Sequence, residues 1–125
     1  RLEDSVRVLG LVPDDTLRVF FEAAEAFVFP SLYEGFGLAP LEAMMAGTPV
    51  VASNVSALPE VLGDAAKFVN PENVFEISRG IHDVLLDAEL RNSLIEKGFV
   101  QARKYSWLEA ARQVAEIYRQ TAQRL

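Results

Sequence analysis

The stretch FPSLYEGFGLAPLEAMMAGTPVV, residues 29–51, decides the fold of this chain. It begins at the end of an apolar run at residues 26–30 and it ends in a second one at residues 48–53. Short unbroken apolar runs are typical of strands buried on both faces of a parallel sheet. A helix is predicted between them, starting at Gly37 or Leu38 and stopping near Gly47, because glycine favours a helix end. The stretch therefore predicts a strand–loop–helix–strand unit.

The same alternation continues on both sides of this unit. Residues 6–12 are rich in β-branched side chains and predict a strand, and a helix should open at Pro13. A short helix at residues 58–62 and a strand at residues 66–69 follow. From residue 74 to residue 124, apolar residues recur at helical spacing. We therefore predict an α/β fold: a Rossmann-like parallel sheet of about four strands, with helices on both faces and a helical carboxy-terminal end.

The composition limits the classes of protein that need to be considered. The chain has 125 residues, half of them hydrophobic, and no cysteine. It suits one domain spanning residues 1–125 and excludes a disulfide framework. The net charge is −6, and the Lys and Arg residues are not gathered into the basic face that nucleic acid requires. The abrupt start, without a signal-peptide pattern, suggests a piece of a longer, cytoplasmic protein.

The loop at residues 31–37 is expected to form a ligand site. In open parallel sheets, ligands bind beyond the carboxyl ends of the strands. The loop holds Glu34 and two glycines, which allow a close approach of backbone to ligand, and Glu42 lies one helical turn further on. The free N–H groups at the helix start, residues 37–39, favour an anion, and carboxylates accept hydrogen bonds from hydroxyls. Together they indicate a sugar–diphosphate–ribose ligand.

The segment EGFGLAPLE also resembles a known motif. From Glu34 to Glu42 it matches the E-x7-E motif of retaining glycosyltransferases with the GT-B architecture. The flanking AEAFVFPS, EAMMAGTPVVAS and LPEVLGDAA agree, as does the Tyr-Ser-Trp start of the final helix. The whole chain resembles the second half of the carboxy-terminal domain of glycosyltransferase family 4, the glycosyl transferases group 1.

This resemblance implies a role for each matching residue in binding a nucleotide-diphosphate-sugar donor. Glu34 would lie by the transferred sugar and is the candidate catalytic residue, and Glu42 would bind the ribose hydroxyls. The backbone of Gly35, Phe36 and Gly37 would approach the sugar. The amides of Gly37, Leu38 and Ala39 would meet the diphosphate, and, from position alone, Leu11, Val12 and Pro13 would touch the base.

Other parts of such an enzyme are not in this chain. Members of the family hold the diphosphate with an Arg and a Lys, and Lys67 and Lys97 do not occupy equivalent positions. A further amino-terminal domain would bind the acceptor, close the cleft and provide any attachment to a membrane surface. One histidine and no cysteine cannot build a metal cluster, so neither a metal nor another cofactor is expected. Full-length, the enzyme would transfer a hexosyl group with retention, and the segment alone should be inactive.

The family sheet has strand order 3-2-1-4-5-6, of which this chain would supply strands 3, 4, 5 and 6. The strand at residues 6–12 would then lack its neighbours. We expect it to take the empty place beside residues 26–30, or two chains to share a sheet in a homodimer formed by strand exchange.

Several alternatives remain open at this point. Ser31 to Glu34 has the spacing of a helix capping box without a ligand role, and Glu42 could be a solvated charge. The chain could be an inactive or designed fragment suited to folding or assembly. It could also belong to a different GT-B enzyme, such as a sugar-nucleotide epimerase; a phosphorylase would need a cofactor lysine or a phosphate cluster, and the sequence indicates neither.

Overall fold

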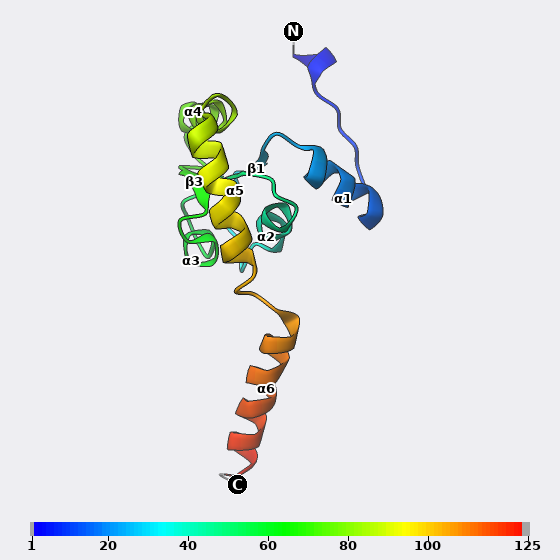
Figure 1. Cartoon of the computed structure of the whole chain (residues 1–125), viewed down its shortest axis with the longest axis vertical. Helices are drawn as coiled ribbons and strands as arrows, with labels where there is room; N and C mark the ends of the chain where they lie inside the picture. The colour runs from blue at the N-terminus through cyan, green and yellow to red at the C-terminus, as the bar shows by residue number, and fades with distance from the viewer. Residues whose placement is uncertain (1, 124–125) are drawn as a thin grey trace.

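The computed structural model describes residues 2–123 and contains a three-stranded parallel sheet (Figure 1). Its strands are β1 (Phe27–Phe29), β2 (Val50–Ser53) and β3 (Ala66–Val69), in the order β1-β2-β3. Val50 of β2 lies beside Phe27 on one side and Ala66 on the other. The predicted α/β class with a parallel sheet is confirmed.

Helices connect and surround the strands. They are a 3₁₀ turn, η1 (Glu3–Ser5), and α1 (Asp14–Ala23), α2 (Leu38–Met45), α3 (Leu58–Leu62), α4 (Val74–Leu86), α5 (Ala88–Ala102) and α6 (Trp107–Ala122). The helix between the two apolar runs and the short helix at residues 58–62 form where they were predicted.

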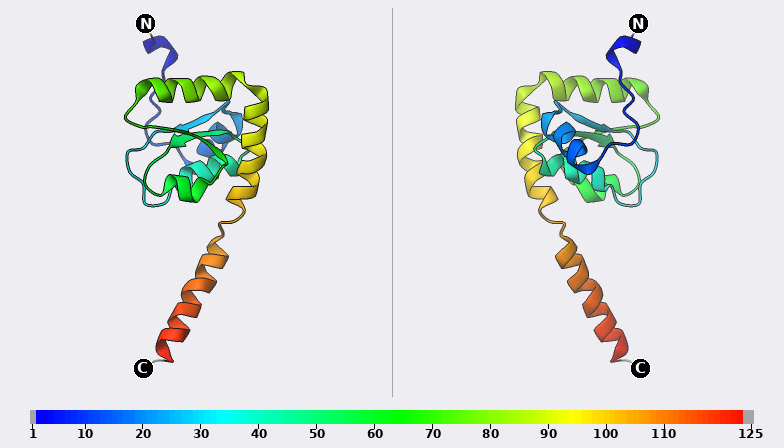
Figure 2. Two further views of the ribbon diagram at one scale, coloured as in Figure 1. Left: turned by 90° about the vertical axis from the view of Figure 1, so that its left-hand side faces the viewer. Right: turned by 90° about the vertical axis from the view of Figure 1, so that its right-hand side faces the viewer.

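The sheet separates two apolar clusters, because successive strand residues point to opposite faces. Val50 and Ala52 face α2 and α3, whereas Val51 faces Val84 of α4. Figure 2 shows the sheet between α4 on one face and α2 and α3 on the other. Helix α4 packs closely, since a Cβ at Gly80 would lie 2.5 Å from a methyl group of Val69. Both faces of β2 are covered, which explains its unbroken apolar sequence.

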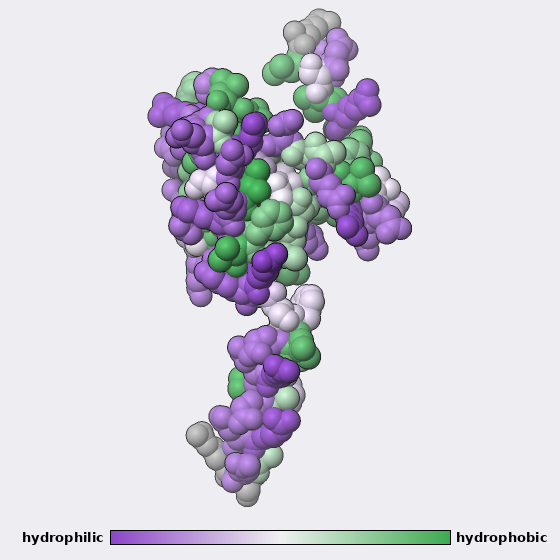
Figure 3. Space-filling model, in the orientation of Figure 1, coloured by the Kyte–Doolittle hydropathy of each residue, from purple (hydrophilic) through white to green (hydrophobic). Residues whose placement is uncertain are grey.

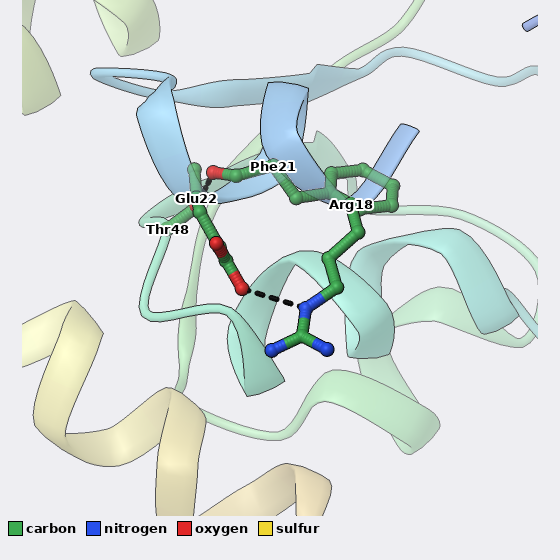
Figure 4. Close-up of polar contacts among 4 residues, drawn as sticks. All are labelled: Arg18, Phe21, Glu22 and Thr48. Atoms are coloured by element: carbon green, nitrogen blue, oxygen red, sulfur yellow. Dashed lines mark hydrogen bonds and ion pairs between the residues drawn. The ribbon is translucent and has the colours of Figure 1, made fainter. Parts of the chain in front are cut away.

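Helix α1 is fastened to the sheet at its carboxy-terminal end. The buried hydroxyl of Thr48 donates a hydrogen bond to the carbonyl oxygen of Phe21 (Figure 4). The ring of Phe21 meets that of Phe27 edge to face, with centroids 5.3 Å apart. The first turns of α1 project away from the sheet and form one wall of the groove described below.

The strand predicted at residues 6–12 is not formed, which corrects one expectation. These residues follow η1 as an exposed segment, with Val8 94% exposed and Leu11 101% exposed. Gly10 takes a left-handed backbone (φ 66°), which interrupts an extended run. Within residues 2–123 the segment has no strand beside it, and β-branched side chains alone do not hold a strand without a partner.

The sheet accordingly has three strands in the described residues, not about four. The expected pairing of residues 6–12 beside β1 is wrong, because β1 pairs only with β2 in this part of the chain. The three residues of β1 are all partly exposed, whereas all four residues of β2 are buried. Within residues 2–123 the other edge of β1 has no strand beside it. Sharing of a sheet between two chains stays a prediction.

Helix α6 projects away from the rest of the chain (Figures 1 and 2). Large apolar side chains occur along it, and Figure 3 shows them as separate patches among polar ones. Trp107 is 80% exposed and Tyr118 is 70% exposed. No helix within residues 2–123 is both long and apolar enough to cross a membrane.

The ion pair between β3 and α4 gives a prediction on acid stability. Lys67 Nζ lies 2.9 Å from Asp83 Oδ2, and its hydrogen bond holds the pKa of Asp83 below the ordinary value of 3.8. A lowered carboxyl pKa stabilises the fold above the ordinary value, and this stabilisation is lost as the pH falls through the folded-state pKa. Asp83→Asn should therefore lower the free energy of unfolding at neutral pH, and the deficit should begin to shrink at about pH 4 and disappear as the pH falls through the lowered pKa of Asp83.

Urea unfolding of both proteins between neutral and acid pH measures this difference. In a Lys67→Met background, Asp83→Asn should no longer give a pH-dependent difference, because the partner of the carboxylate is gone. A deficit that stays constant to the acid end of the series would contradict the assignment.

Candidate functional site

The loop that follows β1 carries the predicted site residues, and it is joined to the loop that follows β2. The backbone N–H of Glu34 donates a hydrogen bond to Ser56 Oγ over 3.0 Å. Ser56 is the one non-glycine residue within residues 2–123 with a left-handed backbone, φ 54°. The carboxyl ends of two neighbouring parallel strands therefore meet at Glu34, as expected for a ligand site in this fold class.

Gly37 makes the sharp turn from this loop into α2. It is the N-cap residue of α2 with φ 101° and ψ 60°, a conformation that favours glycine. A Cβ on Gly37 would lie 2.6 Å from Cδ2 of Leu58, which is fully buried. The turn is therefore fixed both by its dihedral angles and by the packing of α3 beneath it.

The amino-terminal end of α2 leaves its positive potential uncompensated. Among the α-helices within residues 2–123, α2 alone has no acidic residue in its first turn. Pro40 has no N–H, so the free donors of the first turn are those of Gly37, Leu38 and Ala39. Helix α2 begins at Leu38, several residues after Ser31, so the capping-box alternative for Ser31 to Glu34 is wrong.

A groove of about 800 Å³ crosses the outer face of α2. Its lining includes Phe36 from the loop and Leu38 and Glu42 from α2. Residues of α1 form one wall, and the end of α5, the segment that follows it and the start of α6 form the other. Figure 3 shows apolar surface between the body of the chain and α1. The side chain of Glu42 is exposed and borders this groove, so a ligand could reach it.

The predicted residues thus fall into two groups. Phe36, Leu38 and Glu42 line the groove, whereas Glu34, Gly35, Gly37 and Ala39 belong to the adjoining loop and first turn of α2. Leu11, Val12 and Pro13 lie in the segment that leads into α1, whose first residue, Asp14, also lines the groove.

Two lysines of this chain, which could in principle have contacted the diphosphate, form ion pairs with other residues. Lys67 pairs with Asp83, and Lys97 Nζ lies 2.9 Å from Asp64 Oδ2. The hydrogen bond and charge of Lys97 lower the pKa of Asp64. Within residues 2–123, no three His, Asp or Glu side chains are placed to hold a metal ion.

The structure adds a cation that the sequence analysis did not single out. Arg18 on α1 lines the groove, and its Nε lies 2.7 Å from Glu22 Oε1 (Figure 4). The hydrogen bond and charge of Glu22 raise the pKa of Arg18. The i to i+4 spacing of Arg18 and Glu22 would predict their pairing, but not that they face α2.

The sequence of this site unit matches a family of known proteins. The family model described as glycosyl transferases group 1 matches residues 1–101. This chain belongs to the glycosyl transferases group 1. The assignment agrees with the parallel sheet and with the loop-to-helix turn that carries the two glutamates.

Relatives and a solved structure show the same relationship. The chain is 45% identical over 117 residues to O-antigen chain mannosyltransferase B of Escherichia coli, covering 94% of this chain and 31% of that protein. It is 38% identical over 130 residues to the MMP alpha-(1->4)-mannosyltransferase of Mycolicibacterium hassiacum, covering 99% and 31%. It superimposes on a sucrose-phosphate synthase from Thermosynechococcus elongatus with a TM-score of 0.89 and 31% identity, covering 99% and 32%. The chain therefore spans about a third of these proteins and corresponds to part of a GT-B glycosyltransferase.

Proposed function

We propose that this chain binds the nucleotide-diphosphate-sugar donor of a retaining hexosyltransferase. Glu42 accepts hydrogen bonds from the ribose hydroxyls, and the amides of Gly37, Leu38 and Ala39 meet the diphosphate. Glu34 and the backbone of residues 35–37 lie against the sugar. The segment at Leu11 to Pro13 lies on the side of the base, where Asp14 reaches the groove.

One observation carries this proposal: along the chain, the first turn of α2, which has no acidic residue, lies between Glu34 and Glu42. A diphosphate needs N–H donors and positive potential, and the first turn of α2 offers both without a competing acid. A ribose and a sugar need acceptors, which Glu42 and Glu34 supply. An arrangement of acid, free amides and acid matches a ligand with hydroxyls at both ends and phosphates between them.

The relatives support the class of sugar. Two of them are named mannosyltransferases, and mannose is a hexose. The acceptor and the cations that hold the diphosphate are expected in the part of the protein outside this chain. We therefore expect the chain alone to transfer no sugar and the full-length enzyme to be active without a metal or an additional organic cofactor.

The residues at this site suit a reaction whose barrier is lowered mainly by stabilising the negative charge on the leaving diphosphate. In the reaction, the bond between the anomeric carbon and the diphosphate oxygen breaks, the acceptor oxygen bonds to the anomeric carbon on the same face, and the acceptor hydroxyl gives its proton to the leaving diphosphate. Negative charge develops on the diphosphate, where preorganised N–H donors lower the barrier most. Fixing the donor by its ribose and sugar supplies the orientation.

Titration calorimetry of the full-length protein with a panel of nucleoside diphosphates tests the proposal. We expect one nucleotide to bind, and Glu42→Ala to weaken it by roughly 10-fold or more, since hydrogen bonds to a charged group contribute about 1.5–3 kcal/mol. Glu96→Ala removes an equal charge from α5, away from the groove walls, and should leave binding unchanged.

Unchanged affinity in Glu42→Ala would remove the ribose assignment. If no nucleoside diphosphate binds the full-length protein, the proposed function as a whole is wrong.

A further inference from the structure

Phe36 is the only side chain between the two glycines of the loop. On one side, Glu34 is held through its N–H by Ser56, and on the other, Gly37 packs against Leu58. Between them, Gly35 is open: in the described chain, no atom beyond its neighbours lies within 4 Å of where its Cβ would be. The orientation of the peptide groups on either side of Phe36 therefore depends on how its ring is held.

The ring of Phe36 is held by Tyr105, which lies in the segment between α5 and α6. The two rings meet edge to face, with centroids 5.3 Å apart and an angle of 88° between their planes. This is a preferred geometry for aromatic pairs. Phe36 is 39% exposed and Tyr105 is 38% exposed, so each ring buries a large part of its surface.

Tyr105 is itself fixed to the body of the chain. Its hydroxyl donates a hydrogen bond of 3.1 Å to the carbonyl oxygen of Val61 in α3. Its backbone N–H donates a hydrogen bond to the carbonyl oxygen of Ala102, at the end of α5. The Val61 carbonyl also accepts a hydrogen bond of 2.7 Å from Nε2 of Gln101, a buried residue. Tyr105 is therefore held by α3 and α5, and its ring contacts Phe36 of the loop.

We propose that Tyr105 is a positioning residue for the donor-binding loop, acting through the ring of Phe36. This inference rests on the proposed function of the loop. Without the Tyr105 ring, the backbone between Glu34 and Gly37 loses its middle support and samples several orientations. The donor sugar then binds to a loop that must first be ordered, which weakens binding and misplaces Glu34 relative to the anomeric carbon.

The test compares Tyr105→Ala and Tyr105→Phe in the full-length enzyme. Tyr105→Ala should raise the donor KM by about 3- to 10-fold, in keeping with the strength of an edge-to-face pair, and should speed amide hydrogen exchange at residues 35–38 without donor. Tyr105→Phe keeps the ring, and the Val61 carbonyl keeps its bond from Gln101, so both readouts should stay within about 2-fold of the unchanged enzyme.

A double-mutant cycle separates positioning from general destabilisation. Phe36→Ala together with Tyr105→Ala should be no worse than Phe36→Ala alone, because the same contact is lost in both. Val84 belongs to α4 and is buried against the sheet. Val84→Ala is therefore a destabilised control that should leave the donor KM and the amide hydrogen exchange at residues 35–38 unchanged. If Tyr105→Ala does not fold, Tyr105→Leu provides the same comparison with a larger apolar side chain.

The outcomes are distinguishable. An active enzyme in which Tyr105→Ala changes neither donor KM nor exchange at residues 35–38, or in which the two alanine variants are additive, would overturn the inference. A full-length protein that transfers no sugar from any nucleotide sugar would instead overturn the proposed function, and the exchange measurement would still decide whether Tyr105 holds the loop.

Discussion

Gly37→Ala is expected to destabilise the protein strongly and to abolish donor binding, although it adds one methyl group. The backbone at Gly37 has φ 101°, which for alanine costs about 1–3 kcal/mol. The new Cβ would also lie 2.6 Å from Cδ2 of Leu58, which is fully buried and cannot move away freely. Overpacking of this kind costs about 1–3 kcal/mol more. Urea unfolding measures the loss of stability.

Gly35→Ala is the matched control for stability. Two residues earlier in the same loop, Gly35 has open space where a Cβ would stand and no left-handed backbone. Its replacement should change the free energy of unfolding by less than about 0.5 kcal/mol, as expected for an exposed position. Equal losses in the two variants would contradict the account of Gly37.

The effect of Gly37→Ala on the ligand has a separate cause. The chain can relieve the clash only by moving the turn away from Leu58, and this turn aims the free amides of Leu38 and Ala39. Donor affinity measured at a temperature where the variant is still folded should therefore fall below detection. Undiminished affinity in the folded variant would show that these amides do not bind the diphosphate.

The core elements could be predicted from the sequence because their signals are local. Residues 58–62 and 66–69 form the helix and strand expected from their apolar runs and bounding residues. The segment at residues 6–12 has an equally good β-branched composition, yet it does not form a strand. A strand requires a neighbour, and its presence beside β1 depends on chain topology, which residue propensities do not contain.

In the candidate site too, local features could be predicted from the sequence, whereas contacts between distant elements could not. The glutamates, glycines and helix start lie within one short stretch, so their order along the chain already indicates acid, amides and acid. Tyr105, Ser56 and Arg18 reach this stretch from other elements, and only tertiary packing brings them there. Nothing in the local sequence around Tyr105 indicates that its ring would meet Phe36.

Glu34→Gln is expected to lower kcat of the full-length enzyme by roughly 10²–10³, the range seen when one electrostatic contact to a transition state is removed. As the bond to the diphosphate breaks, positive charge develops at the sugar ring, as it does in glycoside hydrolysis. A carboxylate beside the ring stabilises this charge, and an amide of the same shape does not. Glu34 suits this role because its backbone is pinned to Ser56 and its side chain is half-buried.

Glu42→Gln provides the contrast that identifies the two roles. A contact with the ribose is made equally in the ground state and the transition state, so its loss should raise the donor KM and leave kcat nearly unchanged. Steady-state kinetics of both variants, with Glu96→Gln as a control for net charge, separate the two effects. If Glu34→Gln raised only KM, the carboxylate would serve in holding the sugar, and the stabilisation of the transition state would have to come from the diphosphate end of the site.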